Sequence, residues 1–128
     1  MPAIYHLTPA SYYDAQPSDQ PYIPKAFVQE GFIHCTSDLD LLVNVANAYF
    51  ADLPEALLAL EIDPIRLAAP LKFEPPAPPP DAPARSGYAD PDQLFPHIYG
   101  PLNRRAIINC FALRRDKLGR WRLPTREV

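Results

Sequence analysis

Glycine and cysteine are both scarce in this chain of 128 residues, which contains four glycines and two cysteines. With so few glycines there is no GxGxxG, GxxxxGKS or GxxxxGKT segment, which excludes a glycine-rich loop that cradles phosphate. The HExxH and GxSxG signatures are missing as well. Cys35 and Cys110 are too few for a disulfide scaffold and too far apart for a zinc knuckle. These absences remove the common phosphate-loop, hydrolase and zinc-module classes.

Long apolar runs are also absent, since none approaches the ~20 residues that cross a bilayer. The first residues, Met1-Pro2-Ala3-Ile4, lack the charged segment followed by an apolar segment that marks a secretory signal. The two cysteines give no sign of an oxidising compartment. We therefore expect a cytoplasmic protein without a membrane role.

Positive charge is limited. The formal net charge is -3 and the isoelectric point is about 5.5, so a nucleic-acid partner is not expected. Basic residues do cluster at Arg104-Arg105 and again from Arg114 to Arg122. We interpret them as solvated faces, with contact to an anionic substrate as the alternative.

The remaining composition indicates one folded domain spanning residues 1–128, with 48% hydrophobic and 21% charged residues. Proline is abundant, with 18 in the chain, and it is densest in the segment 75–84. Because proline has no backbone donor, we expect this segment to be a stiff surface loop, with a ligand for a signalling module as the alternative. A second proline-containing loop, 16–24, carries Tyr22 as either a lid residue or a core residue.

Hydrophobic patterning predicts six or seven strands and two or three helices. The strands are expected at 3–7, 32–35, 56–62, 71–74, 95–99, 106–113 and 120–123. The continuous apolar run 56–62 is typical of a buried central strand, and 106–113 of a long interior strand. Helices concentrate in the first half of the chain. This order favours an α+β fold with a bent or split, mainly antiparallel sheet.

The clearest helix is expected at 39–50, because one apolar face recurs at i, i+3, i+4 and i+7 through Leu42, Val45, Ala46 and Tyr49. Ser37 or Asp38 is its expected cap. A shorter helix is expected to end near Ala15, with Thr8 as its cap and Pro9 in its first turn.

Histidine is the best indicator of a site. There are three, and His6, His34 and His97 each lie in a short extended segment that ends in a turn. The imidazole can donate, accept, bind a metal or hold a substrate hydroxyl near neutral pH. For any one histidine taken alone, a half-buried side chain satisfied by the backbone is the more common case.

Three kinds of site remain open from the residues. A three-histidine zinc site is one, although the intervals between the histidines carry no metal signature. Nucleophilic catalysis by Cys35 is another, with His6 or His97 as base, since the adjacent His34 points to the opposite face of the strand. The third is an anchoring site for a sugar or nucleotide: His34 and Thr36 share a strand face and would line a pocket beside His6. Tyr5, Tyr22 and Tyr99 would then offer flat faces for a ligand ring. Arg104 or Arg105 would contact a phosphate.

Four segments, in this order, resemble the small bacterial and plant proteins grouped as domain of unknown function 952: Ile4-Tyr5-His6-Leu7, Gly31-Phe32-Ile33-His34-Cys35-Thr36-Ser37, Leu71-Lys72-Phe73-Glu74 and Phe95-Pro96-His97-Ile98-Tyr99-Gly100-Pro101-Leu102. The last segment is the most specific. The resemblance covers nearly the whole chain apart from the proline-rich loop.

The resemblance implies a fold similar to that of ADP-ribosyltransferases, in which two small sheets enclose a cleft that binds NAD. It places His6 on a ribose hydroxyl and the strand end at His34, Thr36 and Ser37 around the nicotinamide. The glutamate that stabilises the transition state in that fold has no clear counterpart, because no Glu-x-Glu pair occurs. Glu74 or His97 is expected in its place.

The function we expect is therefore that of an NAD- or nucleotide-binding domain, with transfer of ADP-ribose to an acceptor as its reaction and no metal. The expected catalytic residues are His97, Glu74 and His34. The expected cofactor-binding residues are His6, Tyr5, His34, Thr36, Ser37 and Tyr99. The alternatives are a non-enzymatic interaction or ligand-binding module and a metallohydrolase.

Overall fold

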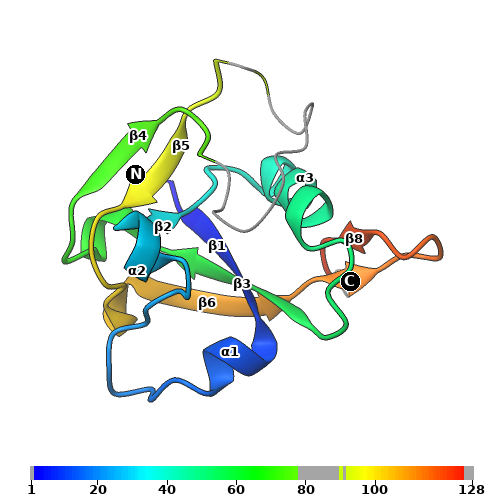
Figure 1. Ribbon diagram of the computed structural model, residues 1–128, viewed down its shortest axis with the longest axis horizontal. Helices are drawn as coiled ribbons and strands as arrows, with labels where there is room; N and C mark the ends of the chain where they lie inside the picture. Colours follow the sequence, from blue (N-terminus) through cyan, green and yellow to red (C-terminus); the bar gives the residue numbers. More distant parts are fainter. Residues whose placement is uncertain (1, 78–89, 91, 126–128) are drawn as a thin grey trace.

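The computed structural model describes residues 2–77, 90 and 92–125, and within these ranges the chain is an α+β fold with antiparallel sheets (Figure 1). One sheet has the order β1-β3-β6, built from β1 (Ile4–Pro9), β3 (Leu57–Ile62) and β6 (Ile107–Ala112). A second has the order β2-β5-β4, built from β2 (Ile33–His34), β5 (Phe95–Ile98) and β4 (Leu71–Glu74). A short hairpin joins β7 (Arg114–Arg115) to β8 (Trp121–Arg122). The predicted α+β class with divided antiparallel sheets is confirmed.

In the described part of the chain, three α-helices and two 3-10 turns connect these strands: α1 (Ala10–Asp14), α2 (Phe27–Glu30), α3 (Leu39–Tyr49), η1 (Pro64–Arg66) and η2 (Arg104–Ala106). The helix predicted at 39–50 corresponds to α3. Its cap is Asp38, because the Asp38 carboxylate accepts the Leu41 N–H at 2.7 Å. Leu42 and Ala46 of the predicted apolar face are fully buried.

The predicted start of the first helix is wrong. Strand β1 continues through Pro9, which pairs with Leu57, and α1 begins at Ala10 without a side-chain cap. The Thr8 hydroxyl is used elsewhere, because it accepts a hydrogen bond from the Tyr22 hydroxyl at 2.7 Å. Tyr22 is 1% exposed and is therefore a core residue and not a lid.

Strand β6 was predicted as an interior strand, and this is also wrong. It pairs with β3 at the end of the order β1-β3-β6, so it forms an edge of that sheet among the described strands. Ile108 is 47% exposed and Cys110 is exposed. The apolar run of the sequence hides this position, because only the residues that flank the strand, Ala106 and Leu113, are buried. The run 56–62, in contrast, gives β3 its predicted central place.

The two larger sheets meet near the start of β1. Tyr5 and Thr36 exchange two backbone hydrogen bonds, of 2.9 and 2.8 Å, which join β1 to the segment that follows β2. Apolar side chains from both sheets form one core, which includes Ile4, Ile33, Leu60 and Ile98. The functional side chains of β1 and β2 are therefore held at a fixed separation.

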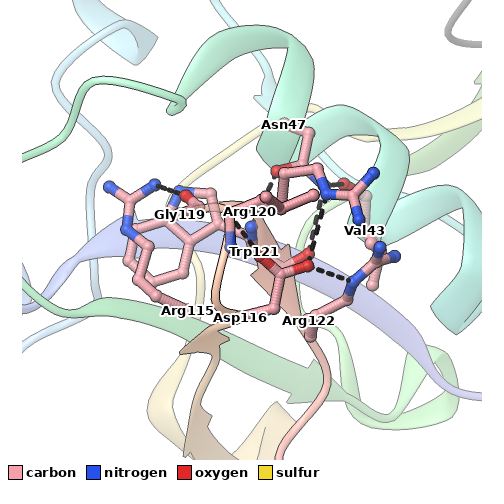
Figure 2. Close-up of polar contacts among 9 residues, drawn as sticks. Val43, Asn47, Arg115, Asp116, Gly119, Arg120, Trp121 and Arg122 are labelled. Atoms are coloured by element: carbon pink, nitrogen blue, oxygen red, sulfur yellow. Dashed lines mark hydrogen bonds and ion pairs between the residues drawn. The ribbon is translucent and has the colours of Figure 1, made fainter.

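The β7–β8 hairpin packs against α3 (Figure 2). Asn47 of α3 accepts the Trp121 N–H at 2.8 Å and donates to the Trp121 carbonyl at 3.1 Å. Asp116 holds the turn, accepting from Arg120 and Arg122 at 3.2 and 3.0 Å. The basic cluster at the C-terminal end is thus partly used in building the hairpin.

Gly100 is a position where a side chain has no room. A Cβ placed there would lie 2.7 Å from the Cβ of Ala69. Because that contact is with a short, inflexible side chain, we expect Gly100→Ala to lower the free energy of unfolding by about 1–3 kcal/mol. Urea unfolding measures the change. Gly119→Ala is a contrasting variant, because the added Cβ has no other atom within 4 Å. Any loss of stability there comes from the backbone, since a φ of 79° strains an L residue.

The proline-rich loop predicted at 75–84 lies largely outside the described residues. Residues 75–77 leave the end of β4, and Pro76 and Ala77 reach the cavity described below.

Candidate functional site

A cavity of about 470 Å³ is lined by residues from β1, α3, β2 and β5 and by the chain segments beside them. The side chains His6, His34 and His97 all line it, although 28 and 63 residues separate them in the sequence. The structure thus brings together the three histidines that sequence analysis singled out.

His6 on β1 is a buried, neutral imidazole. Its Nδ1 donates a hydrogen bond of 2.6 Å to the His34 carbonyl, so in the neutral ring Nε2 is an acceptor. Burial lowers the pKa of His6 to about 4; the His34 carbonyl opposes the shift, whereas the charge of a protonated His34 adds to it. The ring is 5.8 Å from that of Tyr22. Nε2 of His6 is therefore an unprotonated hydrogen-bond acceptor at neutral pH.

His34 on β2 has a carboxylate behind it. Its Nε2 donates to Oε2 of Glu30 at 2.6 Å. The His34 side chain is 29% exposed, whereas that of Glu30 is only 11% exposed. Burial lowers the pKa of His34, the Glu30 carboxylate opposes this shift, and nearby His97 adds to it.

His97 on β5 has a carboxylate as well. Its Nδ1 donates to Oε1 of Glu74 at 2.8 Å, and the Tyr99 hydroxyl donates to the same oxygen at 2.5 Å. The hydrogen bonds from Tyr99 and His97 lower the pKa of Glu74, and in turn Glu74 raises the pKa of Tyr99. The sequence-predicted residues Glu74 and Tyr99 therefore support His97 from behind, and neither lines the cavity.

Register explains why the two imidazoles face each other. His34 and His97 are direct partners in the antiparallel pair of β2 and β5, and their ring centroids are 5.5 Å apart. Phe32 packs against both rings, at 4.8 Å from His34 and 4.5 Å from His97. This packing fixes the orientation of both rings.

Thr36 follows His34 on the same face and lines the cavity. It is 4% exposed, and its Oγ1 is buried without a hydrogen-bond partner in the described part of the chain. Tyr5 also lines the cavity, whereas Ser37 does not. A buried hydroxyl without a partner is costly unless a ligand or water satisfies it.

Cys35 is 3% exposed, belongs to the core shared by the two sheets, and has a pKa raised by burial. A buried thiol of raised pKa is a poor nucleophile. Among residues 2–77, 90 and 92–125, no three histidine, cysteine or acidic side chains are grouped to hold a metal ion. The geometry therefore favours neither a thiol enzyme nor a three-histidine metal centre.

Arg104 was a candidate for phosphate contact, but its guanidinium has other partners. It donates to the carbonyls of Gln20 and Pro17 and to the Tyr13 hydroxyl, at 2.7, 3.0 and 3.1 Å. Arg104 therefore ties down the loop 16–24 and does not line the cavity.

Glu30 is the residue that sequence analysis missed. It ends α2, and Gly31 follows in the left-handed conformation, with a φ of 78°, to turn the chain into β2. The reversal brings Glu30 against His34 four residues later, outside any continuous helix. The sequence feature that could have pointed to Glu30 is its position directly before Gly31, which precedes the strand that carries His34.

The chain belongs to the family described as protein of unknown function (DUF952), whose model matches residues 7–110. The X-ray structure of protein CC0527 from Caulobacter crescentus is similar, with a TM-score of 0.61, 21% identity and 94% of each chain covered. A double mutant of CC0527 matches with a TM-score of 0.60 and the same identity and coverage. These likenesses show a shared fold. No curated protein matches the chain.

The helices of the described ranges are all too short or too polar to cross a membrane.

Proposed function

We propose that this chain binds NAD or a closely related nucleotide in the cavity, as a domain with an ADP-ribosyltransferase-like fold that transfers ADP-ribose to an acceptor. The observation that carries the proposal is the meeting of His6, His34 and His97, from three strands, at one cavity of about 470 Å³. Cavities of roughly 300–1,000 Å³ suit small-molecule and cofactor ligands.

The ribose contact follows from the tautomer of His6. Since Nδ1 donates to the His34 carbonyl, Nε2 accepts, and a sugar hydroxyl supplies the matching donor. This is the role that the family resemblance gives to the histidine of the first strand. The low pKa of His6 keeps this nitrogen unprotonated at neutral pH.

Thr36 and the aromatic side chains supply the contacts for the nicotinamide. The Oγ1 of Thr36 is buried and has no partner in the residues described, so a hydrogen bond from a ligand amide would satisfy it. Tyr5 and Phe32 line the cavity with flat rings against which a heterocycle packs.

Binding without catalysis is the second candidate. Glu74, expected in place of the transition-state glutamate, already accepts two hydrogen bonds and does not line the cavity. Among the described residues that line it, the acidic one is Glu55, which is held by the N–H and hydroxyl of Ser11, both at 2.8 Å. Electrostatic stabilisation of developing charge normally supplies much of the rate enhancement, so its absence favours a ligand-binding module.

The test is a thermal-shift and calorimetry series with NAD, ADP-ribose and nicotinamide. We expect NAD to stabilise the fold, by about 2.7 kcal/mol at a concentration of 100 times its dissociation constant. Thr36→Val keeps the shape of the side chain and should weaken NAD binding roughly 2- to 10-fold through one lost hydrogen bond. Thr36→Ser keeps the hydroxyl and should bind as the unaltered chain does.

Two outcomes contradict the proposal. One is the absence of any stabilisation by the three compounds at millimolar concentration. The other is NAD binding to Thr36→Val and Thr36→Ser with the affinity of the unaltered chain, which would place the nucleotide elsewhere. Release of nicotinamide from bound NAD separates the enzyme from the binding module.

A further inference from the structure

We propose that Glu30 is a positioning residue that makes His34 the proton acceptor of this site, so that His34 deprotonates the water or hydroxyl that takes up ADP-ribose. This inference rests on the proposed function, and it names the group that takes the proton of the acceptor in that reaction.

The direction of the hydrogen bond between His34 and Glu30 supports this role. A carboxylate oxygen accepts, so the 2.6 Å contact with Oε2 of Glu30 places the proton of neutral His34 on Nε2. Nδ1 is then the unprotonated nitrogen, and it has no hydrogen-bond partner among the described residues. His34 lines the cavity and Glu30 does not. The pair therefore presents a base to the cavity, with its carboxylate on the far side.

The environment of the Glu30 carboxylate also supports this role. Its other oxygen, Oε1, is buried and has no hydrogen-bond partner in the described ranges. A carboxylate that is not fully satisfied depends on its single donor, the His34 ring, and its negative charge stabilises the imidazolium that forms when His34 takes a proton. An Asp–His pair in serine proteases works by the same electrostatic logic.

The two histidine–carboxylate pairs differ in how exposed their imidazoles are. Among the described residues, the charged or titratable groups facing His34 are Glu30 from α2, His97 from β5 and His6 from β1. His97 is backed by Glu74 in the same way, but its side chain is only 3% exposed, compared with 29% for His34. Of the two imidazoles, His34 is the one that an incoming hydroxyl reaches more easily.

Transfer of ADP-ribose exchanges one bond at C1′ of the ribose for another. The bond between C1′ of the ribose and the nicotinamide nitrogen breaks, and its electron pair leaves with the now neutral nicotinamide. A bond forms between C1′ and the oxygen of water or of an acceptor hydroxyl. The proton of that oxygen passes to Nδ1 of His34, and the resulting imidazolium keeps its Nε2–H on Glu30 until it loses a proton to solvent. No oxidant, reductant or metal is required.

The experiment compares Glu30→Gln with the unaltered chain in the full-length protein. NAD affinity is measured by calorimetry, nicotinamide release with water as acceptor is measured over a range of pH, and the His34 ring nitrogens are followed by NMR. We expect Glu30→Gln to bind NAD with unchanged affinity and to lower kcat about 10- to 100-fold. The His34 pKa should fall, because the opposing carboxylate charge is lost. The acidic limb of the kcat profile should shift with it.

Two variants serve as controls. Asp19→Asn removes one exposed negative charge from the loop 16–24 and should leave the His34 signals and kcat as they are. Glu30→Asp retains the charge at a greater distance and should recover part of kcat, which a purely structural role of Glu30 does not predict. Circular dichroism establishes that each variant is folded.

Each failure has a distinct signature. A chain that does not bind NAD overturns the proposed function. If NAD is bound but never cleaved, or if Glu30→Gln cleaves it with an unchanged rate and pH profile, the assignment of Glu30 and His34 is overturned while NAD binding stands.

Discussion

Replacement of Trp121 by alanine is expected to lower the free energy of unfolding by about 3–5 kcal/mol. Trp121 is 2% exposed and packs in the second core cluster with Leu7, Leu42 and Leu57. Its Nε1–H donates to the Phe50 carbonyl at 2.8 Å, and this bond is also lost. Urea unfolding followed by circular dichroism measures the difference.

The matched control lies in the same hairpin. Leu118 is 76% exposed at the turn, so Leu118→Ala should change the free energy of unfolding by less than about 0.5 kcal/mol. A loss below about 1 kcal/mol for Trp121→Ala would show that the hairpin of Figure 2 is not part of the cooperative core. The guanidinium of Arg115, 3.7 Å from the Trp121 ring centroid, covers the ring and adds only a minor share.

Acid is expected to destabilise the fold by up to about 3 kcal/mol between about pH 6.5 and pH 4. The pKa of His6 is lowered from 6.5 to about 4 by burial, so in this window the unfolded chain binds a proton that the folded chain does not. Stability therefore falls as pH decreases through the window and is flat above it with respect to His6. The lowered pKa of His34 acts in the same direction.

Urea unfolding at several pH values between 7 and 4 measures this dependence. In His6→Asn the slope should be smaller, because the amide nitrogen, attached to Cγ as Nδ1 is, keeps a donor for the His34 carbonyl and does not titrate. The slope should not vanish, since His34 still contributes. An unchanged slope in His6→Asn would contradict the assignment of the effect to His6.

Local features of the fold were predictable from the sequence. The periodicity of residues 39–50 and the acidic cap at Asp38 identify α3, since both depend on neighbours within one turn. The apolar run 56–62 identifies β3 and its central place. What the sequence could not show is which strands lie at an edge. An apolar run such as 106–113 is compatible with either position, and among the described strands β6 lies at an edge of its sheet.

In the site as well, residue types were predictable from the sequence, whereas contacts between distant residues were not. The three histidines were predicted as its centre because the residue type and the strand ends pointed to them. The pairing of His34 with His97 depends on the register between β2 and β5, which their separation of 63 residues does not reveal. The contacts of Arg104 were also not predictable, because the sequence does not distinguish a basic residue that binds a phosphate from one that donates to loop carbonyls.

The direct pairing of His34 with His97 constrains how the sequence can change in length. Side chains alternate between the two faces of a strand, so one residue inserted into β2 or β5 would turn one imidazole away from the other. A deletion would have the same effect. Length variation among functional relatives is therefore expected in the connections between these strands, and the strands themselves should be constant in length.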